Sequence, residues 1–315
     1  MARHLFAVLL AVPALALTWV FTAFGGLYLA RELRSAVPGG SPSERGGDQV
    51  RELSELLVDQ PWEWKAFGMF AAAAVLLGLV MGAGRFSPLL VLVTGVPIAA
   101  AGIAGALSPA TAKDIAQALP ALGAGEGGLG DTTAGTQSFL LNGGYLLIGV
   151  ALVCAALPAL RAPRRKPLHW VFGLLIGLVA LVVAWGLFLE GAWQRDGVRV
   201  ALLAAAGAVL GYTAGSRFLP RTAAFAAGLP VLTLGVQYLL IQDHTLWLAD
   251  RLFPYGPDMT EHTMRLRGAL LSGTDLYLVL GGALLIAALV PWRRLPRLTP
   301  APAPVAAARK RKAAA

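Results

Sequence analysis

The chain has 315 residues, of which 57% are hydrophobic and only 14% are charged, and its formal net charge is +9. An ordinary soluble domain has about 25% charged residues, so this composition excludes a conventional soluble protein and favours a chain that resides in a lipid bilayer. The single cysteine, Cys154, lies in an apolar run and excludes both an internal disulfide and a cysteine-rich metal site.

A helix needs roughly 20 mostly apolar residues to cross a hydrocarbon core about 30 Å thick. The sequence predicts eight such helices, in chain order 5–30, 66–83, 88–108, 138–160, 168–190, 197–216, 222–241 and 272–292. Lysine and arginine lie at or beyond the ends of these segments. The predicted fold class is an all-α polytopic membrane protein with eight transmembrane helices.

The first of these segments has two interpretations. Arg3 precedes an apolar stretch, and Ala14-Leu15-Ala16 resembles the cleavage site of a signal peptide. The apolar run continues to Ala30, however, which is too long for the apolar core of a signal peptide, and the segment has a counterpart later in the chain. We therefore expect a retained anchor.

Three longer loops are expected on one side of the membrane. Loop 31–65 contains an amphipathic stretch at 48–57 that predicts a short surface helix. Loop 109–137 is expected to open with a helix capped by Ser108 and then to become mobile in the glycine-rich stretch 122–135. Loop 242–271 is expected to hold two short helices, one on each side of a proline-rich turn at 253–257.

The charges predict that both termini lie in the cytoplasm. With Met1 inside, the inner segments are 1–4, 84–87, 161–167, 217–221 and 293–315, and they hold fifteen of the 26 lysines and arginines. All 17 aspartates and glutamates then lie outside or at outer helix ends. Because cytoplasmic loops of membrane proteins are enriched in lysine and arginine, the positive charge indicates membrane orientation, and we do not expect nucleic acid as a partner.

The second half of the chain resembles the first. At an offset of 132, Arg85-Phe86 aligns with Arg217-Phe218 and Tyr145-Leu146 with Tyr277-Leu278; Gly95-Val96-Pro97 aligns with Gly228-Leu229-Pro230 after a one-residue insertion. This pattern predicts a tandem repeat of two four-helix units, 1–160 and 168–292. A four-helix unit begins and ends on one side of the membrane, so the two units would be parallel, as in parallel-repeat transporters.

Polar residues in or near the bilayer are the candidate functional residues, because they are costly there. Five lie toward the outer ends of predicted spans and could form an outward-facing polar vestibule: Asn142, Tyr145, Glu190, Gln237 and Asp275. Three further tyrosines lie at similar depth, at positions 28, 238 and 277. The alternative is that each residue only hydrogen-bonds a neighbouring helix.

Two other features of the sequence are candidate sites. Pro97 and Pro230 occupy equivalent positions in two spans and are candidate hinges, or else static kinks. One outer loop contains His244, Asp250, Asp258, Glu261 and His262. Two histidines and a carboxylate can bind a metal, but the spacing matches no known site, and we expect ordinary loop residues and neither a metal nor a cofactor.

The tail, 293–315, alternates proline with alanine and ends in Arg309-Lys310-Arg311-Lys312. Such a segment cannot bury enough apolar surface to fold, and its charges are suited to anionic lipids of the inner leaflet. A docking site for another membrane protein, or for a second copy of the chain, is the alternative use.

These features leave three functions open. The repeat and the outer polar residues favour a transporter or permease. The large loops and the basic tail favour a non-catalytic structural or assembly component of a cell-envelope complex. A membrane-embedded enzyme that modifies lipids is the third possibility, although no nucleophile–base pair and no phosphate-binding, zinc-protease or hydrolase motif is present. The richness in alanine, glycine and arginine is typical of a GC-rich bacterium and hence of its plasma membrane.

Overall fold

The computed structural model describes ten parts of the chain: 2–35, 64–83, 87–120, residue 122, 132–161, 169–194, 196–216, 219–240, 248–254 and 260–289. Every regular element in these parts is a helix, and none is a strand. The helices are α1 (Ala2–Ser35), α3 (Trp64–Ala83), α4 (Pro88–Leu107), α5 (Pro109–Ala118), α6 (Thr132–Leu141), α7 (Gly144–Arg161), α8 (Trp170–Trp193), α9 (Asp196–Gly215), α10 (Arg221–Leu240), α12 (Glu261–Ser272) and α13 (Thr274–Leu289).

Five of the described helices are long and apolar enough to cross a membrane, and a sixth span results if the bent pair α6–α7 is counted as one. The five spans are Leu9–Tyr28, Lys65–Ala83, Pro88–Leu107, Trp170–Ala192 and Gly197–Gly215. A shorter apolar helix covers Asp275–Leu289. The chain is therefore an all-α protein with the character of a multi-pass membrane protein.

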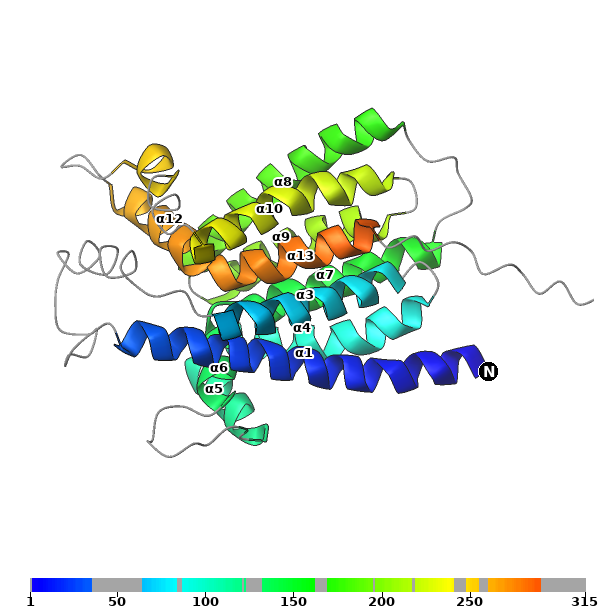
Figure 1. Ribbon diagram of the computed structural model, residues 1–315, viewed down its shortest axis with the longest axis horizontal. Helices are drawn as coiled ribbons and strands as arrows, with labels where there is room; N and C mark the ends of the chain where they lie inside the picture. Colours follow the sequence, from blue (N-terminus) through cyan, green and yellow to red (C-terminus); the bar gives the residue numbers. More distant parts are fainter. Residues whose placement is uncertain are drawn as a thin grey trace, which may run out of the picture.

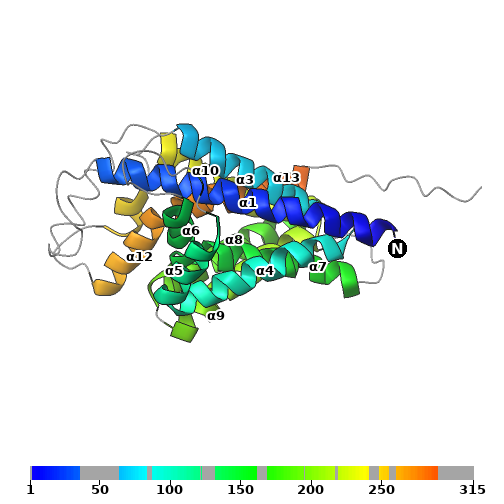
Figure 2. The same ribbon diagram turned by 90° about the horizontal axis from the view of Figure 1, so that it is seen from below.

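The long helices run side by side along the bundle, and α1 extends over its whole length (Figure 1). We call α1 to α7 the first half and α8 to α13 the second half. The end of the bundle opposite the N-terminus carries α5, α6 and α12, and we call it the polar end (Figures 1 and 2). Within the halves α4 packs closely on α7 and α10 on α13, while α7 on α9 and α3 on α13 join the halves.

Glycines allow these helix pairs to approach closely. In the first half, a Cβ atom at Gly149 of α7 would lie 2.2 Å from the backbone nitrogen of Ala99 in α4. In the second half, a Cβ at Gly281 of α13 would lie 2.2 Å from the backbone nitrogen of Leu232 in α10. Small residues that let backbones touch are the usual basis of helix association in membranes, so both pairs are held by backbone contact.

The predicted span 138–160 is wrong as a continuous helix. The chain bends by 68° between α6 and α7, and the break lies at Asn142 and Gly143. Gly143 has φ +76°, a conformation that side-chain-bearing residues rarely adopt. The mean hydropathy of this segment is high and does not reveal the turn. Only the sequence Asn142-Gly143-Gly144 indicates it.

The loops agree in part with the predictions. Helix α5 begins directly after Ser108, whose hydroxyl accepts a hydrogen bond from the backbone of Thr111 at 3.3 Å, as expected. The expectation of a mobile stretch at 122–135 is wrong at its end, because residues from Thr132 onward belong to α6. Helical residues 248–252 and α12 lie on either side of 253–257, as predicted. The predicted helix at 48–57 and the tail lie outside the described residues.

Candidate functional site

The candidate residues come from the helix ends that meet at the polar end. Asn142 and Tyr145 lie at the start of α7, and Asp275 lies in the first turn of α13. Glu190 and Gln237 lie near the ends of α8 and α10, which run in the opposite direction. The contacts of these residues divide into several separate groups.

Tyr145 belongs to a buried network between α1, α6 and α7. Its hydroxyl lies 2.8 Å from the hydroxyl of Thr22 on α1, and its ring meets Phe139 edge-on at 4.9 Å. Nearby, the indole N–H of Trp19 donates to Thr136 of α6 at 3.0 Å. Sequence reasoning missed Trp19, Thr22 and Thr136, although polar residues spaced three apart inside the apolar first span were a usable signal.

A second network joins α8 to α13. The indole N–H of Trp185 donates to the hydroxyl of Tyr277 at 3.4 Å, and the ring of Phe188 meets Tyr277 edge-on at 5.7 Å. Asp275, which is 8% exposed, accepts a hydrogen bond from the backbone N–H of Leu276 at 2.8 Å. An acidic side chain at this place stabilises the start of a helix, so Asp275 has a structural role in α13.

Glu190 lies in a more open group at the end of α8. Its carboxylate accepts a hydrogen bond from the side-chain amide of Gln194 at 3.1 Å, and lies 3.8 Å from Nε2 of His262 on α12. The Glu190 side chain is 41% exposed and that of His262 is 62% exposed. Glu190 is therefore a partly exposed member of the five predicted vestibule residues, and it lies close to a histidine.

Asn142 is exposed at the break between α6 and α7. Beside it, the guanidinium group of Arg199 on α9 donates to the backbone carbonyl of Leu141. A cation at the carboxyl end of a helix is favoured by the helix dipole, so Arg199 ties the end of α6 to the second half. Gln237 is half-buried on α10.

The two candidate hinges lie within tightly packed helix pairs. Pro97 is flanked by Gly95 and Gly102, and a Cβ atom at Gly102 would lie 2.1 Å from the backbone of Leu146. Pro230 is flanked in the same way by Gly228 and Gly235, which contact α13. Such close backbone contacts on both sides of each proline leave little room for a hinge movement, and the choice between hinge and static kink stays a prediction.

The described residues of the histidine-containing loop include an ion pair. Arg267 of α12 is 5% exposed and donates to the carboxylate of Asp250 at 2.5 Å and to the carbonyl of Phe253 at 3.2 Å. Within the described parts of the chain, no group of three or more histidine, cysteine or acidic side chains could hold a metal ion. His244 and Asp258 lie outside those parts.

The described contacts thus bring Glu190 to His262 and place Tyr145 in a network of its own half. Convergence of Asn142, Tyr145, Glu190, Gln237 and Asp275 on one cavity stays a prediction.

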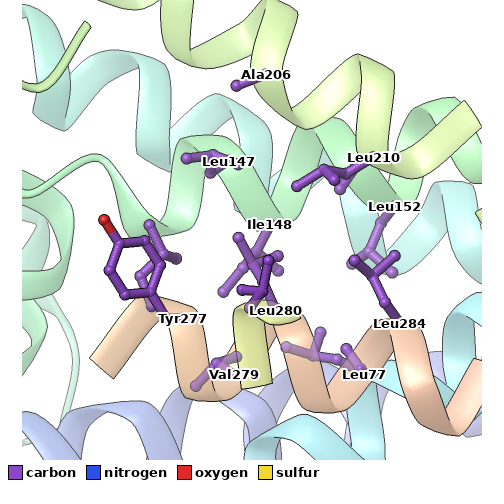
Figure 3. Close-up of a cluster of buried hydrophobic side chains, with 14 of the residues drawn as sticks. Leu77, Leu147, Ile148, Leu152, Ala206, Leu210, Tyr277, Val279, Leu280 and Leu284 are labelled. Atoms are coloured by element: carbon purple, nitrogen blue, oxygen red, sulfur yellow. The ribbon is translucent and has the colours of Figure 1, made fainter. Parts of the chain in front are cut away.

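Between the halves lies an apolar seam. Ile148 and Leu152 of α7 point toward Leu280 and Leu284 of α13 (Figure 3). All four side chains belong to one core cluster, and none is more than 4% exposed. The seam is continued by further buried residues that Figure 3 labels: Leu77, Leu147, Ala206, Leu210, Tyr277 and Val279. Apolar side chains from both halves therefore fill the centre of the bundle.

Comparison with known proteins adds no assignment: no family model, no curated protein and no solved structure matches the chain.

Proposed function

We propose that this protein is a non-catalytic structural component of a cell-envelope membrane complex, built from two four-helix units that are fixed to each other. The observation that carries this proposal is the packing between the halves. It combines the apolar seam with backbone contacts between α7 and α9 and between α3 and α13.

The proposed topology has eight transmembrane spans. Five helices and the bent pair α6–α7 supply six of them, and α10 and α13 are the remaining two. Helix α10 has 20 residues, or about 30 Å at 1.5 Å per residue, which matches the hydrocarbon core. Helix α13 has 16 described residues, and the apolar character of the sequence continues to Val290.

The internal repeat is supported by contacts that recur at an offset of 132 or 133 residues. Gly211 of α9 lies against the carbonyl of Ala151, and Gly78 of α3 lies against the carbonyl of Ala283. The two carbonyls differ by 132 in residue number and the two glycines by 133. Ile148 and Leu152 correspond to Leu280 and Leu284 at the offset of 132, so equivalent residues form the seam.

The proposed orientation places the polar end outside the cell. At the opposite end of the bundle lie the N-terminus, the end of α7 at Arg161 and the start of α10 at Arg221. In the sequence, the adjoining segments 162–168 and 216–220 contain further arginines and a lysine. These positive segments favour the cytoplasm. The basic tail, 293–315, is then available to anionic lipids or to a partner inside the cell.

A rigid contact between the halves distinguishes this proposal from transport. A Cβ atom at Gly211 would lie 2.0 Å from the carbonyl oxygen of Ala151, and one at Gly215 would lie 2.0 Å from that of Ala155. Alternating access in repeat proteins moves one unit against the other. Here such a movement would separate backbones that are in direct contact and expose the seam, so the geometry favours a fixed frame.

Cysteine accessibility tests this proposal without knowledge of a substrate. In a Cys154→Ala background, Leu280→Cys and Leu152→Cys are introduced singly, and cells are treated with a membrane-permeant and an impermeant maleimide. We expect neither reagent to label either seam cysteine. The control, His262→Cys, lies at an exposed position and should be labelled from outside. Labelling of the seam would overturn the proposal.

Transport is the second candidate, and the open group of Glu190, Gln194 and His262 favours it. A partly exposed carboxylate at the outer end of the bundle could attract a cation or an amine. In that case the seam would be the closed state of a pathway, and seam cysteines should become reactive under transport conditions. Retention of transport of every tested solute by Glu190→Gln would count against this candidate.

A further inference from the structure

The two contacts that join the halves use side chains of opposite sizes at equivalent positions. Between α7 and α9, Val150 faces Gly207: a Cβ at Gly207 would lie 3.3 Å from Cβ of Val150. Between α13 and α3, Gly282 faces Ala74: a Cβ at Gly282 would lie 2.7 Å from Cβ of Ala74. Each contact therefore pairs one side chain with one glycine, but the larger partner is on the opposite member of the helix pair.

This reversal of side-chain sizes matters because α3 and α9 present similar surfaces in one membrane, and so do α7 and α13. Helix α3 carries the small residues Ala74, Gly78 and Gly82 at intervals of four, and α9 carries Gly207, Gly211 and Gly215. Helices α7 and α13 offer the carbonyls that such stripes contact. In lipid there is little hydrophobic driving force between helices, so the fit of the surfaces decides which helices pair.

Pairing within a half would lose this fit. Helix α3 on α7 would set Ala74 against Val150, and the extra volume would force the backbones apart. Helix α9 on α13 would set Gly207 against Gly282 and leave a void that no side chain fills. Only the pairing across the halves combines a side chain with a glycine at both contacts.

We propose that this exchange of volume makes the two contacts non-interchangeable, so that each half recognises the other half and not the equivalent surface of its own. The partner for α3 is α13, the partner for α7 is α9, and residues 74, 150, 207 and 282 select them. This proposal rests on the internal repeat. Its test measures stability, whereas the test of the structural function measures accessibility, so the two can fail separately.

The experiment converts the α3–α13 contact into a copy of the α7–α9 contact in the full-length protein. Gly282→Val alone places a large side chain against Ala74 and should lower the Tm in detergent by roughly 5 °C or more. Adding Ala74→Gly recreates the combination of valine and glycine and should restore at least half of the loss.

A matched control tests whether the rescue depends on the residue that faces position 282 or on any alanine-to-glycine change. Ala206 of α9 is fully buried, like the alanine at position 74, and lies next to Gly207. Combined with Gly282→Val, Ala206→Gly should restore nothing, because Ala206 belongs to α9 and not to the contact between α3 and α13.

A milder pair keeps the test interpretable if valine prevents folding. Gly282→Ala should lower the Tm by a smaller amount and should also be rescued by Ala74→Gly. Equal rescue by Ala206→Gly, or no loss of stability in both Gly282→Val and Gly282→Ala, would overturn the proposal.

Discussion

At the closest contacts between helices, the missing side chain of a glycine makes room for the backbone of a neighbouring helix. Gly211 is the sharpest case, because a Cβ atom there would lie 2.0 Å from the carbonyl oxygen of Ala151. Such an overlap cannot be relieved by turning a side chain. The two helices must separate, and the contacts along their whole interface weaken together.

We predict that Gly211→Ala lowers the Tm of the purified protein by about 3 to 8 °C, as expected for an overpacking cost of about 1 to 3 kcal/mol. Fluorescence-detected thermal unfolding in detergent measures this change. Gly186 is the matched control, because a Cβ atom at this glycine of α8 would have no neighbour within 4 Å. Gly186→Ala should leave the Tm unchanged or raise it.

The hydroxyl of Tyr145 provides a second residue-scale test. Tyr145→Phe removes its 2.8 Å hydrogen bond to Thr22 but keeps the ring contact with Phe139. Thr22 can still bond to the backbone carbonyl of Thr18. Hydrogen bonds between membrane helices average about 0.6 kcal/mol, so we expect a fall in Tm of about 1 to 3 °C. Tyr212→Phe, at an exposed ring, should cause no change; a large loss in both variants would contradict the assigned role.

At the scale of elements, the apolar helices were predictable because each depends on a long local run of hydrophobic residues. The break between α6 and α7 was not found by that criterion. It depends on the positive φ of Gly143 and on the bond from Arg199 to the carbonyl of Leu141, 58 residues away in sequence. The polar networks were found only in part, because the partners of Tyr145 and Tyr277 are set by how α1 and α8 pack.

Helix α12 is tied to the helical residues 248–252 by Arg267. Because the carboxylate partner, Asp250, is 57% exposed, the pair is worth less than a fully buried one. We predict that Arg267→Ala costs about 1 to 2 kcal/mol locally and raises hydrogen exchange in α12 by about tenfold, with little change in the spans. Arg251→Ala, at an exposed neighbour, is the control. Equal protection of α12 in both variants would show that the ion pair is not what holds it.

At the scale of the whole molecule, the proposed orientation gives a direct prediction. A fluorescent protein fused after Ala315 should fluoresce, and alkaline phosphatase at the same place should be inactive, because the C-terminus is expected in the cytoplasm. Phosphatase inserted after Leu119, beyond α5 at the polar end, should be active. The reverse pattern would invert the topology and place the arginine-containing connections outside.

The proposed internal repeat also belongs to this scale, and its sequence basis is the match of Arg85-Phe86 with Arg217-Phe218 and of Gly95-Val96-Pro97 with Gly228-Leu229-Pro230. The sequence did not show which residue of α3 corresponds to which residue of α9, because matching alanines are common in apolar helices. By their contacts Gly78 corresponds to Gly211, because each lies against a backbone carbonyl of a helix in the other half. The filled seam was equally hidden, since an isolated sequence does not show which face of α7 meets α13.

Seen as an electrical component, the seam of Ile148, Leu152, Leu280 and Leu284 is an insulator. An ion placed there without water or a counter-charge would face a Born energy on the order of tens of kcal/mol, far above thermal energy. In a planar bilayer held at 100 mV, the voltage supplies only about 2.3 kcal/mol to a monovalent ion. The protein at rest should therefore add no measurable conductance to the membrane that contains it.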